Sequence, residues 1–300
     1  MNVVLPKPGA YIIAVSGGVD SRALLDILYK DSQNNSNWKL IVAHLDHGMR
    51  SDSADDRKFV QAITKQYDLL FEYHTIALGV GASEARARAE RYTYLNRLQK
   101  KYDAQAVITA HHQDDVLETA IINLLRGSGR KGLSALSSQP KLLRPLLGVT
   151  KQELLDYAGQ HGLNWREDST NQDDSYLRNY VRHNILPRFD IQARRQFLEI
   201  IQNMKALNTS LDDLLNEQLQ LQDNTGTITR TWFNNLPHAV AKETLASWLR
   251  LHKLANFDAQ TLERLVVNAK AARTGQQFPV VNNYTMKVNK NYLALEPAER

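Results

Sequence analysis

Four short apolar segments, each of the length of a buried β-strand, alternate with helical patterns through the first half of the chain. The strand-like segments are residues 11–15, 40–43, 69–76 and 106–110. A helical spacing of apolar residues follows each of them. Strands that alternate with helices in this way form βαβ units, so we expect an α/β fold built on a doubly wound, mainly parallel sheet. Ligands of such sheets bind at the carboxyl ends of the strands.

The pattern changes near residue 190. Residues 191–221 carry long helical patterns rich in Gln, Asn and Leu, and two further helices are expected around 238–253 and 258–271. Apolar and polar residues alternate from Val280 to Leu293, which is typical of a hairpin. We therefore predict a catalytic domain at residues 1–190 and a smaller, mainly helical C-terminal domain at 191–300 that ends in a small β-hairpin.

The segment SGGVDS, residues 16–21, lies directly between the first strand and its helix. Two glycines allow a tight turn and a close approach to a ligand, and the start of a helix favours an anion, so the segment resembles a phosphate cradle. Asp20 fits such a cradle if a divalent cation lies between it and the phosphates, and we assign it to Mg²⁺. The alternative is an ordinary Gly-Gly turn in which Asp and Ser cap the helix. The chain contains no GxxxxGK[ST], so this is not a Walker loop.

Two clusters of acidic and imidazole side chains follow predicted strands. HLDHGMR, residues 44–50, comes after the second strand, and HHQDDVLET, residues 111–119, comes after the fourth. Both clusters fall where a doubly wound sheet places its ligand, and such groups bind metal, hold a nucleotide or transfer protons. RGSGRKG, residues 126–132, contains GxGxxG but follows a helix, so we reject a Rossmann fingerprint. A basic loop near phosphates and a solvated basic turn are both compatible with it.

Composition narrows the function classes further. The 300 residues include no cysteine, which excludes disulfides, Cys-ligated metal and a thiol nucleophile. Lys and Arg number 37 against 32 Asp and Glu, and the resulting charge of +5 is compatible with a polyanionic partner. Neither a secretory signal nor a run of about 18 apolar residues is apparent, so we expect a cytoplasmic protein with no membrane partner.

SGGVDS after a hydrophobic strand resembles the PP-loop of the N-type ATP pyrophosphatases, which cleave ATP between the α and β phosphates. A longer series of motifs, over roughly residues 10–190, resembles the tRNA(Ile)-lysidine synthases. These motifs are SGGVDS, LDHGMRSDSADD, EARARAERY, HHQDDVLET, LRGSGRKGL, RPLL, EDSTN and RNYVRHNILP. The resemblance implies a ligase that joins free L-lysine to the first anticodon cytidine of the isoleucine tRNA with a CAU anticodon. ATP adenylates the cytosine O2, and the lysine amine then displaces AMP.

The resemblance also implies roles for individual residues. The residues implied to bind ATP are Ser16, Gly17, Gly18, Val19, Asp20, Ser21 and, beside the adenosine, His44. The implied catalytic residues are Asp20, His111 and Asp115, with Mg²⁺ held by Asp20 and Asp115. The residues implied on the lysine or tRNA side are Asp114, Asp115, Arg88, Arg91, Arg126, Arg130, Lys131, Arg178 and Arg182, with weaker assignments for Asp168, Ser169, Asn171 and Asn179. Glu118 is expected to brace the helix that follows the fourth strand. Residues after 190 resemble the helical tRNA-contacting domain of the family, which implies that residues 191–300 contact tRNA. We also expect the chain to end without the additional C-terminal module of longer members, and this difference concerns how the protein discriminates among tRNAs rather than its chemistry.

Several other functions remain open at this point. PP-loop thiolases acting on RNA need cysteine, which this chain lacks. Another PP-loop amidating or adenylating enzyme is one alternative. A metal-dependent hydrolase that uses HLDH and HHQDD as ligands is another, although it leaves SGGVDS unexplained. A non-enzymatic RNA-binding module is disfavoured by the carboxylates placed where phosphates would lie. A homodimer is compatible with each of these functions.

Overall fold

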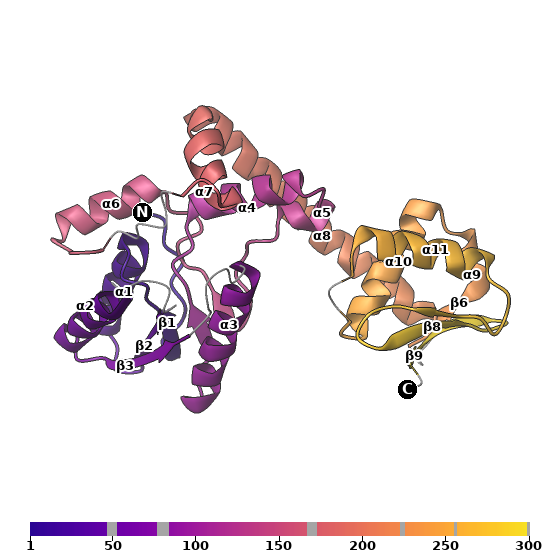
Figure 1. The fold of residues 1–300 in the computed structure, drawn as a ribbon, viewed down its shortest axis with the longest axis horizontal. Helices are drawn as coiled ribbons and strands as arrows, with labels where there is room; N and C mark the ends of the chain where they lie inside the picture. The colour runs from indigo at the N-terminus through magenta and orange to yellow at the C-terminus, as the bar shows by residue number, and fades with distance from the viewer. Residues whose placement is uncertain (47–52, 77–83, 167–172, 223–225, 255–256, 299–300) are drawn as a thin grey trace. The chain divides into compact units, whose positions relative to one another are not determined.

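The computed structural model describes residues 1–46, 53–76, 84–166, 173–222, 226–254 and 257–298. The chain forms two compact units, which are described separately (Figure 1). The first unit comprises Met1–Ser128 and Gly132–Ile201, and the second comprises Gly129–Lys131 and Gln202–Arg300. The division falls inside one long helix, later in the sequence than the boundary predicted near residue 190.

A five-stranded sheet forms the centre of the first unit. Its order is β3-β2-β1-β4-β5, and every pair of neighbouring strands is parallel. The strands are β1 (Ala10–Ala14), β2 (Lys39–Asp46), β3 (Leu70–Thr75), β4 (Ala106–Ile108) and β5 (Leu142–Leu143). The predicted doubly wound parallel sheet is therefore confirmed.

Helices cover both faces of this sheet, because its buried strands are apolar on both sides. Tyr11 and Ile13 of β1 face the cluster formed with α1 (Val19–Ser32), α2 (Ser53–Gln66) and α6 (Lys151–Gln160). Ile12, between them, belongs to the cluster on the opposite face, which includes Leu95 and Leu98 of α3 (Glu84–Lys101). This alternation along β1 holds α1 against one face and α3 against the other.

The strand order places the switch point of the sheet between β1 and β4. The chain winds outward from β1 to β2 and β3, and β4 and β5 lie on the other side of β1. The connections that leave β1 and β4 therefore separate, and the crevice between them is the ligand position of such sheets. Those connections contain SGGVDS and HHQDD.

The rest of the first unit is helical and packs on α4 (Gln113–Leu125). Leu117, Ile121 and Ile122 of α4 contact a cluster that includes Val181, Leu186 and Ile201. Residues 177–188 form three short helical pieces. They are α7 (Leu177–Tyr180), the π-helical turn η2 (Val181–Ile185) and the 3₁₀ turn η3 (Leu186–Arg188). A one-turn helix, α5 (Arg130–Leu133), follows α4, and its first two residues belong to the second unit.

Helix α8 (Ile191–Gln222) begins in the first unit and continues into the second. The second unit adds α9 (Arg230–Asn235), α10 (His238–Leu251) and α11 (Ala259–Ala271), whose core includes Phe233, Trp248 and Leu265. The predicted hairpin is β8 (Tyr284–Val288) with β9 (Tyr292–Pro297). It is extended to a four-stranded antiparallel sheet by β7 (Gln277–Pro279) beside β8 and β6 (Ile228–Thr229) beside β9. In the described part of the chain, no helix is both long and apolar enough to span a membrane.

Candidate active site

The loop between β1 and α1 is held in a tight turn by Ser21. The Ser21 hydroxyl accepts hydrogen bonds from the backbone N–H groups of Ser16, at 3.2 Å, and Gly17, at 3.3 Å, and it donates to the carbonyl of Gly18, at 2.9 Å. Gly17 has φ of +99°, which L side chains rarely adopt, and a Cβ atom there would lie 3.4 Å from Val60. Ser21 thus shapes the loop from inside, and its predicted contact with the phosphates of ATP stays a prediction.

The first turn of α1 follows this loop. Gly18 is the N-cap residue, and no described side chain caps the helix there. The first backbone N–H groups of a helix have no partner within the helix, and the helix dipole favours an anion beside them. The 14-residue helix α1 therefore presents Val19, Asp20 and Ser21 in the geometry of a phosphate site.

The loop after β4 is ordered by a reciprocal cap at the start of α4. His112 is the N-cap residue, and its Nδ1 accepts a hydrogen bond from the Asp114 N–H at 3.3 Å. The His112 N–H donates to Asp115 Oδ2 at 2.9 Å. Both His112 and Asp115 are buried. The cap therefore fixes the Asp115 carboxylate at the carboxyl edge of the sheet.

The two loops meet at His112. Its Nε2 atom lies 3.7 Å from Asp20 Oδ2 and 3.6 Å from Asp115 Oδ2. The sequence had placed both carboxylates at the ligand edge of the sheet, and the structure brings them to one imidazole. The sequence analysis gave His112 no role of its own, although its N-cap position before two aspartates was a readable signal.

Charge around Asp115 keeps this carboxylate ionised. Burial would raise the pKa of the Asp115 carboxyl, but electrostatic interactions with His112, His111 and Arg178, together with the hydrogen bond from the His112 backbone, lower it overall. The guanidinium groups of Arg178 and Arg182 lie 3.8 and 3.7 Å from Asp115 Oδ1. At neutral pH, Asp115 is therefore an anion held among cations.

His111, in contrast to Asp115, is kept uncharged by its surroundings. Its Nδ1 lies 2.8 Å from the Thr109 hydroxyl. Burial lowers the pKa of His111 to about 4, although the Asp115 carboxylate opposes this shift. The imidazole is therefore neutral at pH 7 and can accept a proton or a hydrogen bond.

Glu118 lies one turn beyond Asp115 on α4 and is fully buried. Arg182 binds it with two hydrogen bonds, Nε to Oε1 at 2.6 Å and Nη2 to Oε2 at 3.0 Å. Burial raises the pKa of Glu118, and the Arg182 ion pair opposes this effect. Arg178 donates to the Thr119 hydroxyl at 3.2 Å. The structure thus brings Arg178 and Arg182 to the site, where they contact the acidic residues of α4.

Asp114 points toward a different partner. Its Oδ2 lies 3.4 Å from Arg194 Nη1 near the start of α8. Arg194 also donates hydrogen bonds to the carbonyls of Leu186, at 3.1 Å, and Phe189, at 3.2 Å. In this structure Asp114 helps to hold the start of α8, and its predicted contact with lysine or tRNA stays a prediction.

His44 lies at the end of β2, beside the first loop. Its Nδ1–H donates to the Val15 carbonyl at 2.8 Å, and the side chain is buried. Burial lowers the pKa of His44, opposed by the hydrogen bond to Val15 and the charge of Asp46. The ring is therefore fixed next to the residue that precedes SGGVDS, a position compatible with the predicted contact to adenosine.

Lys151 is a site residue that the sequence reasoning missed. Its Nζ donates to Asp20 Oδ1 at 2.7 Å. Lys151 is the first residue of α6, whose Ala158 packs in one cluster with Val19 of α1. No local pattern links Lys151 to a loop 131 residues earlier, and in the sequence it is only part of the cap begun by Thr150.

The remaining predicted residues are spread over several elements. Arg88 stacks on Tyr92 within α3, and its charge contributes to the lowered pKa of His111; Arg91 lies on the same helix. Arg126 is the C-cap of α4, about 16 Å along the helix from Asp115. Asn179 donates to the Asp173 carbonyl at 2.8 Å. The predicted residues His47, Asp168, Ser169 and Asn171 lie outside the described residues.

Arg130 and Lys131 belong to the second unit. Arg130 contacts Asp212 at 3.1 Å and Glu243 at 2.7 Å, and Lys131 contacts Asp212 at 2.6 Å. Arg130 also donates to the Asn208 side chain at 2.6 Å. These ion pairs tie the short segment 129–131 to α8 and α10, so both residues have a structural task besides the predicted contact with tRNA.

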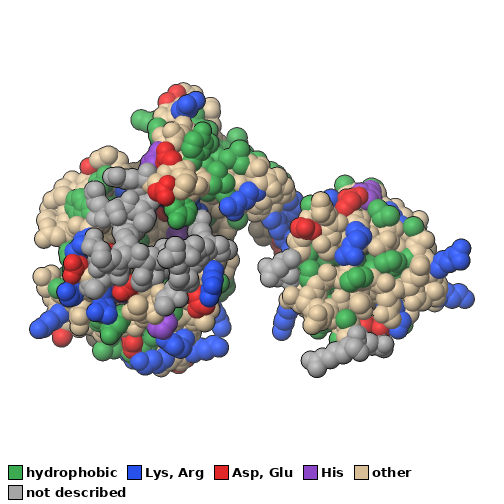
Figure 2. Space-filling view, in the orientation of Figure 1, with side chains coloured by type: hydrophobic (Ala, Val, Ile, Leu, Met, Phe, Trp, Pro, Cys, Tyr) green, Lys and Arg blue, Asp and Glu red, His purple; other side chains and the backbone are tan. Residues whose placement is uncertain are grey.

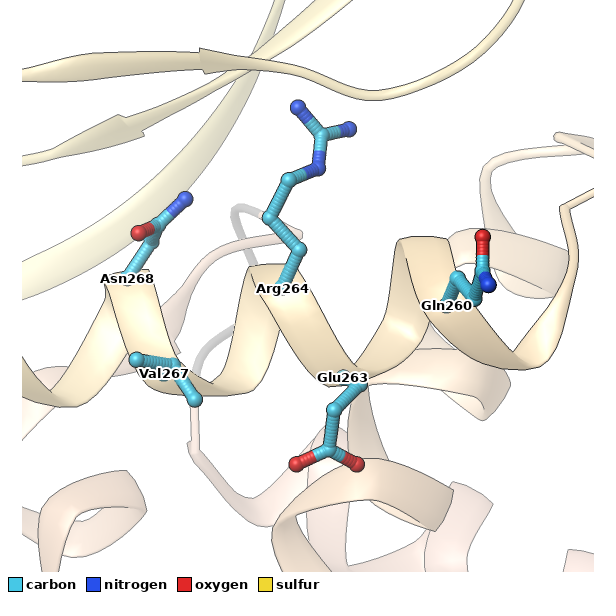
Figure 3. Close-up of a pocket in the computed structure, with 5 residues that line it drawn as sticks. All are labelled: Gln260, Glu263, Arg264, Val267 and Asn268. Atoms are coloured by element: carbon cyan, nitrogen blue, oxygen red, sulfur yellow. The ribbon is translucent and has the colours of Figure 1, made fainter.

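The second unit has a hollow of about 350 Å³ on the surface of α11. Figure 3 shows that Arg264 and Asn268 project from one side of the helix and Glu263 and Val267 from another. Glu263 pairs with His238 at 2.6 Å and with Lys242 at 3.0 Å. None of the predicted site residues lines this hollow.

The residues at the switch point fit the expected Mg²⁺. Mg²⁺ in nucleotide sites is held by one or two carboxylates, and phosphate oxygens and water complete its coordination. Asp20 and Asp115, which approach the same nitrogen of His112, supply such a pair. Among the described residues, no three His, Asp or Glu side chains are grouped closely enough to hold a metal without a phosphate ligand.

Comparison with known proteins agrees with this geometry. A model of the PP-loop domain matches residues 3–189. The tRNA(Ile)-lysidine synthase of Idiomarina loihiensis is 29% identical over 288 residues, which cover 91% of this chain and 64% of that protein. The enzyme of the same name from Thermotoga sp. is 38% identical over 183 residues, which cover 59% of this chain and 44% of that protein. The chain thus spans about two thirds or less of the length of these relatives.

A solved structure shares the fold. The U34-tRNA thiolase NcsA from Methanococcus maripaludis aligns with a TM-score of 0.58 and 18% identity, over 68% of this chain and 74% of that one. At this identity the likeness concerns the fold alone. Because the matching model covers well over half of the sequence, the chain belongs to the PP-loop domain family.

Proposed function

We propose that this protein ligates free L-lysine to C2 of the first anticodon cytidine of the CAU-anticodon isoleucine tRNA, with conversion of ATP to AMP and pyrophosphate. The product would be lysidine, which switches the tRNA to reading AUA. The main support for the proposal is that the carboxylates of Asp20 and Asp115 both lie close to His112 Nε2 at the switch point of the sheet. The relatives named tRNA(Ile)-lysidine synthase support the choice of substrates.

In the first step, the cytosine O2 attacks the α-phosphorus of ATP, and the bond to the β-phosphate breaks. The first turn of α1 binds the phosphates through its free N–H groups. Asp20 and Asp115 would hold Mg²⁺, which when bound would supply positive charge to the phosphate oxygens. His44 orients the adenosine side, and His111, neutral at pH 7, accepts hydrogen bonds near the phosphates.

In the second step, the lysine amine attacks C2 and the bond from C2 to O2 breaks, so that AMP leaves with the oxygen. The ammonium group of lysine must lose its proton before it attacks. Asp115 is ionised and can hold the ammonium and take this proton. The guanidinium groups of Arg178 and Arg182 limit its basicity by lying near Oδ1.

The tRNA partner would bind largely through its phosphates. Helix α3 carries the basic residues Arg86, Arg88, Arg91, Arg97, Lys100 and Lys101. Figure 2 shows Lys and Arg side chains gathered at the edge of the first unit where α3 ends. Binding through such groups weakens steeply with added salt. We therefore expect the affinity for tRNA to fall by at least about tenfold between 50 and 200 mM salt.

The test is a complete reaction with a defined product. The protein is incubated with ATP, Mg²⁺, L-lysine and total bacterial tRNA, and the digested nucleosides are analysed by mass spectrometry. A cytidine heavier by lysine minus water is expected, and it should be absent when lysine is omitted or when Asp20→Asn replaces the parent protein. Formation of AMP with a different modified nucleoside would favour another PP-loop enzyme, and the absence of AMP would reject the proposal.

A further inference from the structure

The phosphate loop contains no cation of its own. Residues 16–21 comprise two serines, two glycines, a valine and an aspartate, so the loop adds negative charge where a triphosphate would bind. In Walker loops, a lysine inside the loop contacts the phosphates and offsets their negative charge, and this sequence has no such lysine. Any cationic side chain beside the phosphates therefore comes from another part of the fold.

We propose that Lys151 binds the phosphates of ATP that leave as pyrophosphate, an inference that rests on the proposed ATP-dependent function. Its ammonium group is 2.7 Å from Asp20 Oδ1, at the start of α1 where those phosphates would lie. In the free protein, Lys151 is held by the carboxylate that we assign to Mg²⁺. With Asp20 engaged by Mg²⁺, the Lys151 ammonium would be free to contact the phosphate oxygens.

The backbone of Lys151 is fixed, while its side chain can move. Thr150 and Glu153 form a reciprocal cap in which the Thr150 N–H donates to Glu153 Oε2 at 2.8 Å. Helix α6 packs against α1, beside which it lies in Figure 1. The Lys151 side chain is 39% exposed, and four methylene groups allow its ammonium to shift by several ångströms. The residue can therefore exchange a carboxylate for a phosphate without a movement of the helix.

Removing Lys151 would have opposite effects on the affinity for pyrophosphate, depending on whether its ion pair with Asp20 is purely structural or Lys151 binds phosphate. If Lys151 only neutralised Asp20, its removal would free the carboxylate for Mg²⁺, and Mg²⁺ with pyrophosphate would bind as well as before or more tightly. If Lys151 binds phosphate, its removal weakens the binding of pyrophosphate and of ATP. The direction of the change in affinity separates the two roles.

The experiment measures the affinity for inorganic pyrophosphate and for ATP by titration calorimetry at fixed Mg²⁺, without tRNA or lysine. We compare Lys151→Met, which keeps the length of the side chain, with Lys151→Arg, which keeps its charge. Lys30→Met is the matched control, because Lys30 also pairs with a carboxylate of α1, at 2.8 Å from Asp26, and is similarly exposed. Melting temperatures verify that each variant is folded, and Lys151→Gln replaces Lys151→Met if the latter unfolds.

We expect Lys151→Met to bind pyrophosphate and ATP roughly tenfold or more weakly, the loss typical of one charge-assisted hydrogen bond. Lys151→Arg should retain most of the affinity, and Lys30→Met should equal the parent. In the complete reaction, Lys151→Met should raise the KM for ATP and leave the KM for lysine unchanged. Unchanged or tighter pyrophosphate binding in Lys151→Met, or no pyrophosphate binding by the parent, would overturn the inference. These binding results do not depend on which nucleoside is made, so a failure of the lysidine assay alone leaves them interpretable.

Discussion

The carboxylates of Asp20 and Asp115 approach the same atom, Nε2 of His112, at 3.7 and 3.6 Å. One carboxylate comes from the first turn of α1, after β1, and the other from the first turn of α4, after β4. Their meeting follows from the strand order, which makes β1 and β4 neighbours at the switch point. The pair gives the site its negative charge and the expected place for Mg²⁺.

Asp20→Asn should abolish AMP formation while the protein stays folded. The amide keeps the size of the side chain but removes the charge that would bind Mg²⁺. AMP release from ATP in the presence of tRNA and lysine measures the effect, and a fall of at least about a hundredfold is expected for loss of a charged metal ligand. Asp55→Asn, at an exposed residue paired only locally with Lys58, serves as the control. Near-parent AMP formation by Asp20→Asn would show that Asp20 does not hold the metal.

Asp115→Asn should impair lysine use more than ATP binding. Asparagine can still accept the hydrogen bond from the His112 N–H, so the cap of α4 survives while the charge is lost. Asp115→Ala removes the cap as well and should also lower the melting temperature. The measurements are lysine incorporation into tRNA and the apparent affinity for lysine, with the ATP affinity measured in parallel. An amine of lower pKa, such as hydroxylamine, should partly restore displacement of AMP in Asp115→Asn. Full lysine incorporation would move this role to Asp114 or Glu118.

The protein should lose stability as the pH falls from 6.5 toward 4, in part because of His111. Burial lowers the pKa of His111 to about 4, while the unfolded chain has the ordinary value of 6.5. In this window the unfolded state binds a proton that the folded state does not, so acid favours unfolding, by about 2 kcal/mol at pH 5. Urea unfolding at pH 7 and pH 5 checks this, with His111→Gln expected to reduce the loss. The exposed His161→Gln is the control, and equal losses in both variants would contradict the prediction.

Glu118→Ala should destabilise the first unit by roughly 2–3 kcal/mol. The substitution leaves the Arg182 guanidinium without its bidentate partner in a buried setting, and part of the penalty is relieved because about a third of Arg182 is exposed. Glu118→Gln should cost less, because its carbonyl oxygen still accepts one hydrogen bond. Chemical unfolding of both variants gives the values. A Glu118→Ala protein as stable as the parent would mean that Arg182 finds another partner.

A chain truncated after residue 190 should be less stable than one truncated after residue 201. Phe197, Leu198 and Ile201 pack against α4, so the shorter chain exposes apolar surface worth on the order of 3 kcal/mol or more. Melting temperatures of the two proteins test this directly. Both should bind tRNA more weakly than the full chain if the second unit contacts tRNA, as predicted from the sequence. Equal melting temperatures would place the limit of the first unit earlier than Ile201.

Much of the fold could be predicted because its signals are local. Apolar runs such as residues 11–15 and 40–43 are continuous because parallel strands are buried on both faces, and β1 to β4 each lie within a few residues of their predicted positions. The caps begun by His112 and Thr150 follow from side chains that bond to nearby backbone. The four-stranded sheet of the second unit was harder to predict, since β6 and β7 are only two and three residues long and gain their stability from pairing with β9 and β8.

The sequence by itself determined the alternation of strands and helices, the turn of SGGVDS and the placement of two acidic clusters at strand ends. Only the tertiary structure decided which charged groups meet. Lys151 pairs with Asp20, Arg182 with Glu118, and Arg194 with Asp114. Arg130 and Lys131 lie in a segment that the sequence indicates to be a basic loop or turn, and in the structure they pair with acidic side chains of α8 and α10. Backbone conformation depends largely on neighbours along the chain, whereas an ion pair depends on distance in space, which is set by how the helices pack.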